Sequence, residues 1–289
     1  MESCVVRLSQ IQGQLPPAER RVAQYFIDNT MEIVGQPIEQ VADACATSKT
    51  TVVRVCKQLG YQGYKAFCTA LAADLATGGQ NRLAYADVRP GDDLDAIIHT
   101  VTQHNRAAVE DTARILSKEW LKKAVEAIIK ASRVDFYGVG ASGIVALDAQ
   151  EKFFRVGKNS QSSLDPHVQV VLASCLKPGD VAVFFSYSGE TLDTLDTYQI
   201  AKNAGATVIS VTRYGNCRLS RAADIPLYVA TTEMLVRSSA MSSRIAMMHV
   251  VDILFSAAAT QAYQEYKPYL DITHMAGREK RRAQRERRR

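Results

Sequence analysis

Hydroxyl side chains and a glycine are clustered at residues 186–191, which read SYSGET. The cluster follows an apolar run at 181–185 with the character of a buried strand, and a helical stretch begins directly after it. Hydroxyl and main-chain N–H groups at a helix N-terminus can donate hydrogen bonds to a phosphate, and the helix dipole favours an anion there. For any single serine, the plainer alternative is a hydroxyl that caps the helix. The pattern predicts a phosphate-binding loop with contacts from Ser186, Ser188, Gly189 and Thr191.

A glycine-rich turn lies at residues 138–143, which read GVGASG, between a strand-like run and a helical stretch. Its glycines, Gly140 among them, let the backbone approach an anion, and Ser142 is placed to reach the same phosphate. The pattern also matches the GxGxxG of dinucleotide sites, with Asp165 as the acid that would bind the ribose. A dinucleotide site does not require a second loop rich in hydroxyls, so the loop at 186–191 favours a phosphate site, and dinucleotide binding is kept as an alternative because of the GxGxxG match.

A third polar segment, residues 233–244, follows the last predicted strand and opens the closing helix. Glu233 could hydrogen-bond sugar hydroxyls or act as a general base, and Arg237 could pair with a carboxylate or a phosphate. Their plainer roles are a helix-start acid and a surface ion pair. Glu233 is the strong candidate for the base of a phosphosugar isomerase, which is therefore a further alternative. We expect no catalytic residue and no cofactor. We also expect no metal, since the histidines lack metal-ligand spacing.

Small polar and basic residues line a short predicted helix at 49–59, between an N-capping serine and Gly60. A preceding helix at 38–45 and a short turn complete a helix-turn-helix, whose second helix reads the major groove. No acid lies between Asp43 and Asp74, and arginine can read guanine with two hydrogen bonds. A helical bundle with a solvated basic face is the plainer alternative. The pattern predicts DNA contacts from Ser48, Lys49, Thr50, Thr51, Arg54 and Lys57, opposite a buried stripe of Val52, Val53, Cys56 and Leu59.

Strand-like and helical stretches alternate from residue 133 onward, whereas residues 1–77 have helical spacing throughout. Such alternation predicts a parallel sheet covered by helices on both faces. The predicted strands are 134–137, 160–164, 181–185, 207–211 and 225–229, and a closing helix spans 240–263. We therefore expect a helical DNA-binding domain at 1–77, a linker at 78–93, an α/β domain with two leading helices at 94–265, and a basic tail at 266–289.

The composition is that of an ordinary globular protein, with 47% apolar and 22% charged residues among 289. This length suits two domains, and the composition excludes collagen-like, disulfide-scaffold and fully disordered classes. No segment has the ~18 apolar residues of a membrane helix, and the N-terminus lacks the layout of a signal peptide. We expect a cytoplasmic protein that binds no membrane. The six cysteines form no CxxC pair, which favours free and mostly buried thiols.

Positive charge is concentrated at the C-terminus. The net charge is +5, and residues 278–289 alone hold eight Arg or Lys and two Glu, so the remaining residues sum to −1. Any binding of nucleic acid by the body of the chain must therefore use a local basic patch. The arginine-rich end is either a solvated tail or a source of additional affinity for DNA phosphates.

Taken in order, residues 48–64, 138–143 and 186–191 resemble the RpiR-type bacterial transcriptional regulators, in which a helix-turn-helix domain precedes a sugar isomerase (SIS) domain. The resemblance covers nearly the whole chain, from about residue 5 to about residue 265. Within it, the segments at 138–146 and 237–244 look most similar to members of the family that regulate the use of N-acetylmuramate. It implies an all-α helix-turn-helix domain followed by a flavodoxin-like α/β SIS domain, with a parallel sheet flanked by helices. It further implies a homodimer or homotetramer that binds double-stranded operator DNA and senses a phosphosugar. The phosphate contacts implied are Ser142, Ser186, Ser188 and Thr191, and the arginine-rich end lies outside the family's pattern.

Overall fold

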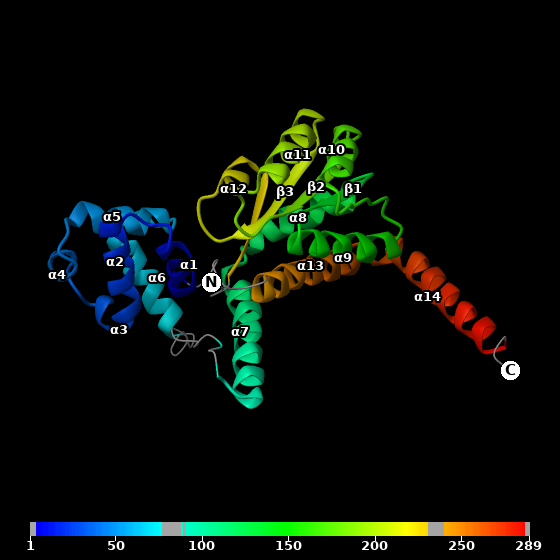
Figure 1. Cartoon of the computed structure of the whole chain (residues 1–289). Helices are drawn as coiled ribbons and strands as arrows, with labels where there is room; N and C mark the ends of the chain where they lie inside the picture. The colour runs from blue at the N-terminus through cyan, green and yellow to red at the C-terminus, as the bar shows by residue number, and fades with distance from the viewer. Residues whose placement is uncertain (1–3, 77–87, 89–90, 231–239, 287–289) are drawn as a thin grey trace. The chain divides into compact units, whose positions relative to one another are not determined.

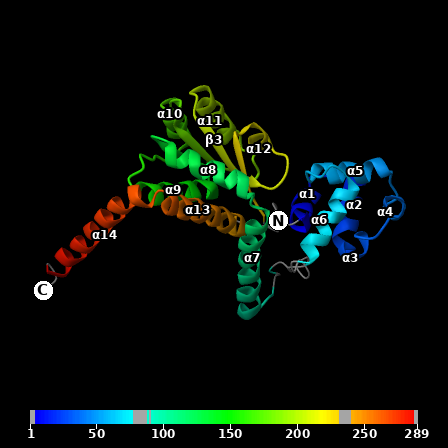
Figure 2. The same cartoon turned by 180° about the vertical axis from the view of Figure 1, so that it is seen from behind.

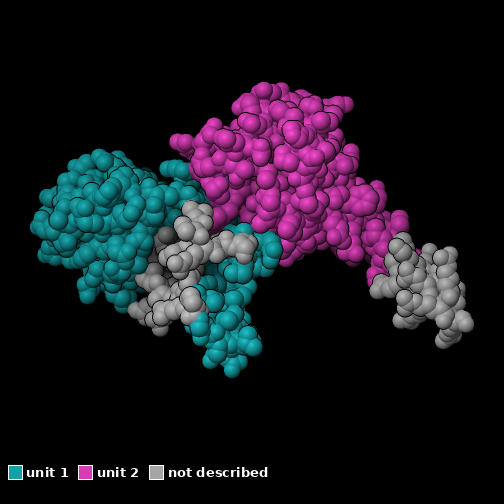
Figure 3. All heavy atoms as spheres, viewed as in Figure 1, with its two compact units in different colours: residues 1–117, 213–216, 228–246 teal, residues 118–212, 217–227, 247–289 magenta. Residues whose placement is uncertain are grey.

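The computed structural model describes residues 4–76, 88, 91–230 and 240–286 (Figure 1). The chain forms two compact units (Figure 3). The first comprises residues 1–117, 213–216 and 228–246, and the second comprises residues 118–212, 217–227 and 247–289.

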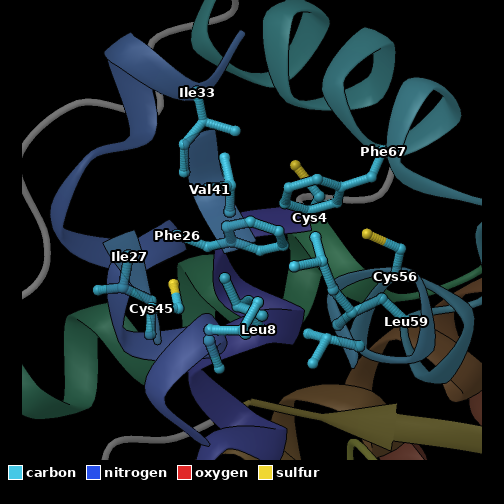
Figure 4. Close-up of a cluster of buried hydrophobic side chains, with 14 of the residues drawn as sticks. Cys4, Leu8, Phe26, Ile27, Ile33, Val41, Cys45, Cys56, Leu59 and Phe67 are labelled. Carbon is cyan, nitrogen blue, oxygen red and sulfur yellow. The ribbon is translucent and has the colours of Figure 1, made fainter. Parts of the chain in front are cut away.

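Helices fill residues 4–76, as their spacing predicts. Their apolar faces converge on a core in which the rings of Phe26 and Phe67 stack with their centroids 4.6 Å apart (Figure 4). Burial of these side chains away from water holds the short helices together. Burial also raises the pKa of the Cys56 thiol to about 12, and all six cysteines are free thiols, as predicted. The helices are α1 (Cys4–Gln12), α2 (Pro17–Asp28), α3 (Thr30–Ile33), α4 (Ile38–Ala44), α5 (Lys49–Gln58) and α6 (Tyr64–Ala76).

The two leading helices predicted before the sheet are present as α7 (Leu94–Ile115) and α8 (Lys118–Lys130). Asp93 caps α7, since its Oδ1 accepts a hydrogen bond from the Ala96 N–H at 2.8 Å. Near the other end of α7, the Thr112 hydroxyl exchanges hydrogen bonds with the main chain of Ala230, at 3.0 and 3.2 Å. This buried pair ties α7 to the end of the last strand.

The strands form a sheet in the order β1-β2-β3-β4. β1 and β2 pair in parallel, as do β2 and β3, which confirms the predicted parallel sheet. Every residue of β1 and β2 is buried, as expected where helices cover both faces. The strands are β1 (Val134–Tyr137), β2 (Val181–Phe185), β3 (Thr207–Arg213) and β4 (Ile225–Val229).

The strand predicted at 160–164 does not form. Residues 159–161 instead run beside β1, where the Val134 and Phe136 N–H groups donate to the carbonyls of Asn159 and Gln161, both at 2.9 Å. The Gln161 N–H donates to the Asp135 side chain at 3.1 Å, so a carboxylate takes the place of a main-chain acceptor. If this segment is counted as a short second strand, the order becomes 2-1-3-4-5, that of flavodoxin-like sheets.

Different helices cover the two faces of the sheet (Figures 1 and 2). On one face, Tyr137 and Phe184 stack at 4.7 Å and pack with α10 (Pro166–Ser174), α11 (Leu192–Asn203) and α12 (Arg218–Ala222). On the other, Phe136 stacks at 5.5 Å on Phe153 of α9 (Ala141–Arg155), which meets Phe255 of α13 (Met241–Gln261). Successive residues of a strand point to opposite faces, so β1 contributes to both layers.

Helix α14 (Tyr263–Glu286) continues the chain where a tail was predicted. Tyr266 is 1% exposed, and the Lys158 ammonium lies 5.8 Å from the centre of its ring. The first turns of α14 therefore pack against the end of α9. Among the described residues, no single helix has the length and apolar character of a membrane span, although α13 and Tyr263–Met275, bent by 111°, pass such a test as a pair.

Candidate functional site

A tight turn joins α4 to α5, so the predicted helix-turn-helix is present. Ala46 in this turn has a φ of 47°, in the left-handed region that side chains rarely adopt. Arg21 of α2 holds the turn from outside, since its Nε donates to the Cys45 carbonyl at 3.1 Å and its Nη2 to the Ala46 carbonyl at 3.2 Å. The Ser48 hydroxyl caps α5 by accepting from the Thr51 N–H at 3.2 Å.

The outward face of α5 carries the predicted DNA contacts. Ser48, Lys49, Thr50, Arg54 and Lys57 are exposed, whereas Thr51, next to the cap, is half-buried. The prediction that Val53 lies in the buried stripe is wrong, because helical spacing brings Val55 there and leaves Val53 half-buried. The buried side chains of α5 and its end are Val52, Val55, Cys56 and Leu59.

Two cations of α5 have carboxylate partners that sequence reasoning missed. Lys49 Nζ donates to Glu39 Oε1 at 2.6 Å, and this hydrogen bond lowers the pKa of the Glu39 carboxyl. Arg54 Nη1 donates to Glu19 Oε1 at 3.1 Å. The acid-free window around α5 describes the chain locally, but acids from α2 and α4 approach its cations in space.

The phosphate-binding loops predicted in the second unit lie at one edge of the sheet, because each follows one of two adjacent parallel strands, β1 and β2. From β1 the chain crosses to the segment at 159–161 on one side, and from β2 it crosses to β3 on the other. The two loops thus flank the topological switch point, where open α/β sheets bind ligands. The loops lead into the N-termini of α9 and α11.

The loop after β2 is stabilised by its own hydroxyls. The Gly189 N–H donates to Ser186 Oγ and the Glu190 N–H to Ser188 Oγ, both at 3.2 Å. A hydroxyl that accepts a hydrogen bond still carries its own O–H donor. Ser186 is only 3% exposed, Ser188 and Thr191 are half-buried, and Thr191 is the N-cap residue of α11 without a capping bond from its side chain.

Gly189 is required by the packing of this loop. Its φ is 68°, and a Cβ at this position would collide with the Sγ of Cys217. A glycine alone fits there without strain. The Leu219 N–H donates to the Gly189 carbonyl at 3.2 Å, so the loop is anchored to α12.

The loop after β1 is held from α10. The buried Gln169 donates through Nε2 to the carbonyls of Gly138 at 2.8 Å and Ser163 at 2.7 Å, a role that sequence reasoning missed. A Cβ on Gly138 would lie 2.6 Å from the Ser142 carbonyl oxygen, so the turn into α9 needs glycine. Gly140 is the N-cap residue of α9, and Ser142, in its first turn, is half-buried.

The remaining candidate residues fall elsewhere. Asp165 caps α10, since its Oδ1 accepts from the His167 N–H at 2.8 Å, which is a structural use of the acid considered for a ribose. Glu233 and Arg237 lie outside the described residues. Among the described residues, no group of His, Cys, Asp or Glu side chains is arranged to hold a metal ion.

Comparisons with known proteins find a matching family for each half of the chain. Residues 127–257 match the SIS domain, and residues 3–78 match the helix-turn-helix domain of the rpiR family. An HTH-type transcriptional regulator of Caldanaerobacter subterraneus subsp. tengcongensis, itself uncharacterised, is 37% identical over 273 residues, which cover 94% of this chain and 96% of that protein. The HTH-type transcriptional regulator HexR of Pseudomonas aeruginosa is 31% identical over 266 residues, with 91% and 92% covered.

A solved structure, the Vibrio vulnificus NanR protein complexed with ManNAc-6P, is similar with a TM-score of 0.59 and 28% identity, over 95% of this chain and 97% of that one. With its helix-turn-helix and its SIS domain in this order, the chain belongs to the RpiR family of transcriptional regulators.

Proposed function

We propose that this regulator controls sugar metabolism and acts in the cytoplasm. We further propose that its SIS domain senses a phosphosugar, and that this ligand is the phosphate of an amino sugar. The observation that carries the proposal is the pair of loops at the switch point, where two helix N-termini and several hydroxyls meet. The relative NanR was solved with ManNAc-6P, an amino-sugar phosphate, which supports the same ligand class here.

The phosphate of the ligand would bind to loop amides and hydroxyls. The proposed contacts combine hydroxyl donors with glycines that permit close approach of the main chain. Glu233 and Arg237 would contact the sugar and its anionic groups. The loop residues proposed to contact the phosphate are Gly140, Ser142, Ser186, Ser188, Gly189 and Thr191.

On the DNA side, α5 would enter the major groove of an operator. Ser48, Lys49, Thr50, Thr51, Arg54 and Lys57 would contact bases and phosphates. In a homodimer or homotetramer, two such helices would bind successive major grooves, ~34 Å apart. A phosphosugar would change operator affinity through its differential affinity for two arrangements of the oligomer.

We further propose that the SIS domain binds its ligand without converting it and without a cofactor. This separates the regulator from a phosphosugar isomerase and from a dinucleotide-binding protein. Proton NMR of an aldose 6-phosphate incubated with the full-length protein should show no ketose product. Appearance of the isomer in proportion to the amount of protein would make the domain an enzyme.

A thermal-shift panel tests the choice of ligand. Purified full-length protein is heated with amino-sugar 6-phosphates, with the same sugars lacking phosphate, and with nicotinamide dinucleotides. A ligand that binds the native state raises the melting temperature by mass action. We expect the melting temperature to rise only with a phosphosugar. A rise with a dinucleotide would instead favour a dinucleotide-binding site.

Replacing Ser186 by Ala tests the phosphate-binding loop. We expect a loss of about 1.5–3 kcal/mol in phosphosugar affinity, since the lost hydrogen bond is to a charged group. Isothermal titration calorimetry measures this difference. Ser174→Ala is the matched control, because Ser174 is an exposed serine at the far end of α10. Equal affinities for the two variants would remove Ser186 from the site.

A further inference from the structure

Glu19 is a buried acid whose partners both come from the DNA-binding helix. It lies in the first turn of α2, where the helix dipole favours a carboxylate, and its side chain is 4% exposed. Oε1 accepts from Arg54 Nη1 at 3.1 Å, and Oε2 accepts from Gln58 Nε2 at 2.7 Å. A buried carboxylate is costly unless it is paired and hydrogen-bonded. Both of its oxygens therefore fix side chains on the outer flank of α5.

One nitrogen of the Arg54 guanidinium is bound to Glu19, and the rest of the side chain is largely exposed to solvent. Its Nη1 binds Glu19, while its side chain remains 61% exposed on the face that carries Lys57 and Thr50. A guanidinium has five N–H donors in a rigid fork, so one anchored nitrogen leaves Nε and Nη2 for other acceptors. An arginine held in this way loses less conformational freedom when it binds a base.

We propose that Glu19 is a positioning residue for DNA recognition: it orients Arg54 so that the unanchored edge of the guanidinium reads a base in the major groove. This inference rests on the proposed binding of operator DNA by α5. Glu19 itself lies on the buried side of Arg54 and does not contact DNA. It acts on the base preference of the protein through the geometry of Arg54.

The pair of Lys49 and Glu39 supplies a contrast within the same motif. Both of these side chains are more than half exposed, and their ion pair is open to solvent at 2.6 Å. An exposed ion pair contributes little to stability, and its carboxylate competes with a DNA phosphate for the lysine. Glu39 therefore opposes DNA binding, whereas Glu19 supports it.

This contrast gives the test its matched control. Glu19→Gln and Glu39→Gln each remove one negative charge next to a cation of α5. If the acids acted by charge alone, both variants would bind DNA more tightly. We expect Glu39→Gln to tighten binding to any duplex. The second probe is a short duplex that the wild-type protein enriches from a random pool. We expect Glu19→Gln to bind this duplex about tenfold more weakly, and we expect the variant protein to discriminate less between bases at one base pair.

A double-mutant cycle separates positioning from stability. Once Arg54 is replaced by Ala, the added change Glu19→Gln should have no further effect on affinity for the enriched duplex. Glu19→Asp keeps the charge but shortens the side chain, and it should also relax base preference. Circular dichroism and thermal unfolding identify the variants that fold, and affinities are compared among those.

The outcomes distinguish this inference from the proposed function. If the wild-type protein enriches no duplex, DNA binding by α5 itself is wrong. If it enriches one and Glu19→Gln retains its affinity and base preference, the positioning role fails while the proposed function stands. Additive losses for Glu19→Gln and Arg54→Ala would likewise overturn the role of Glu19.

Discussion

Ala46 shows at the residue scale how the turn of the helix-turn-helix is stabilised from outside. A left-handed alanine costs about 1–2 kcal/mol, yet the turn adopts it while Arg21 binds two of its carbonyls. The hydrogen bonds from Arg21 of α2 therefore offset this strain, and the turn keeps a backbone conformation that Ala46 disfavours.

Replacing Ala46 by Gly should stabilise the protein. Glycine adopts positive φ without strain, and after its larger entropy in the unfolded chain is counted we expect a gain of about 0.5–1 kcal/mol. Urea unfolding followed by circular dichroism measures the gain. Ala70→Gly, in the interior of α6, is the control and should lose stability. A lower stability for the Ala46 variant would contradict the strain assigned to this turn.

Side chains that act through local pattern could be predicted from the sequence, and those that act across the fold could not. Ser48 as an N-cap, and the position of the SYSGET segment between a strand and a helix, follow from neighbouring residues alone. Glu19 lies 35 residues before Arg54, and Gln169 lies 31 residues after Gly138. Their roles depend on tertiary packing, which residue type and spacing do not encode.

At the scale of elements, β1 is held by a buried charge. Asp135 is fully buried and accepts from Arg133 Nε at 2.9 Å and Nη2 at 2.6 Å. The Tyr137 hydroxyl and the Gln161 N–H also donate to it, each at 3.1 Å. The proximity of Asp135 raises the pKa of Arg133, so the guanidinium stays charged. This carboxylate joins β1 to the segment beside it.

Replacing Asp135 by Asn should destabilise the SIS domain by about 3–5 kcal/mol, the cost of breaking a buried ion pair by removing one partner. Denaturant unfolding measures the loss. Glu119→Gln removes an exposed partner of Lys123 on α8 and should change stability little. Similar values for the two variants would show that the Asp135 network contributes nothing beyond a surface pair.

The same network explains where element prediction failed. β1 to β4 fall at or near their predicted positions because apolar runs bounded by turns specify them. The run at 160–164 was predicted as a strand, but residues 159–161 are bound partly by a side chain and form a single bridge. The Asp135 carboxylate interrupts main-chain pairing along this segment, and the residue types at 160–164 do not reveal it.

For the whole molecule, the order of a helical domain and an α/β domain was predictable from the change in spacing near residue 133. The extension of α14 was not, because the arginine-rich run at 278–289 has a composition typical of a tail. Tyr266 and Tyr269 fix the first turns of α14, with the Tyr269 ring against Gly157. Helical structure then continues into the arginine-rich end.

Deleting residues 278–289 should affect DNA binding without unfolding the protein, because the buried Tyr266 precedes the deletion. These residues hold eight Arg or Lys. We expect weaker binding to every duplex and a shallower dependence of log affinity on log salt concentration, with base preference retained. Fluorescence anisotropy over a series of salt concentrations measures the slope. An unchanged slope would show that the arginines do not contact phosphates.

Among the free thiols, Cys175 is exposed, at the end of α10. It precedes β2, so it lies at the opposite edge of the sheet from the hydroxyl-rich loop that follows β2. A maleimide dye would couple there in preference to the buried thiols and leave the loops at the switch point untouched. The native chain thus carries its own attachment point for a fluorophore, away from the loops proposed to bind phosphate.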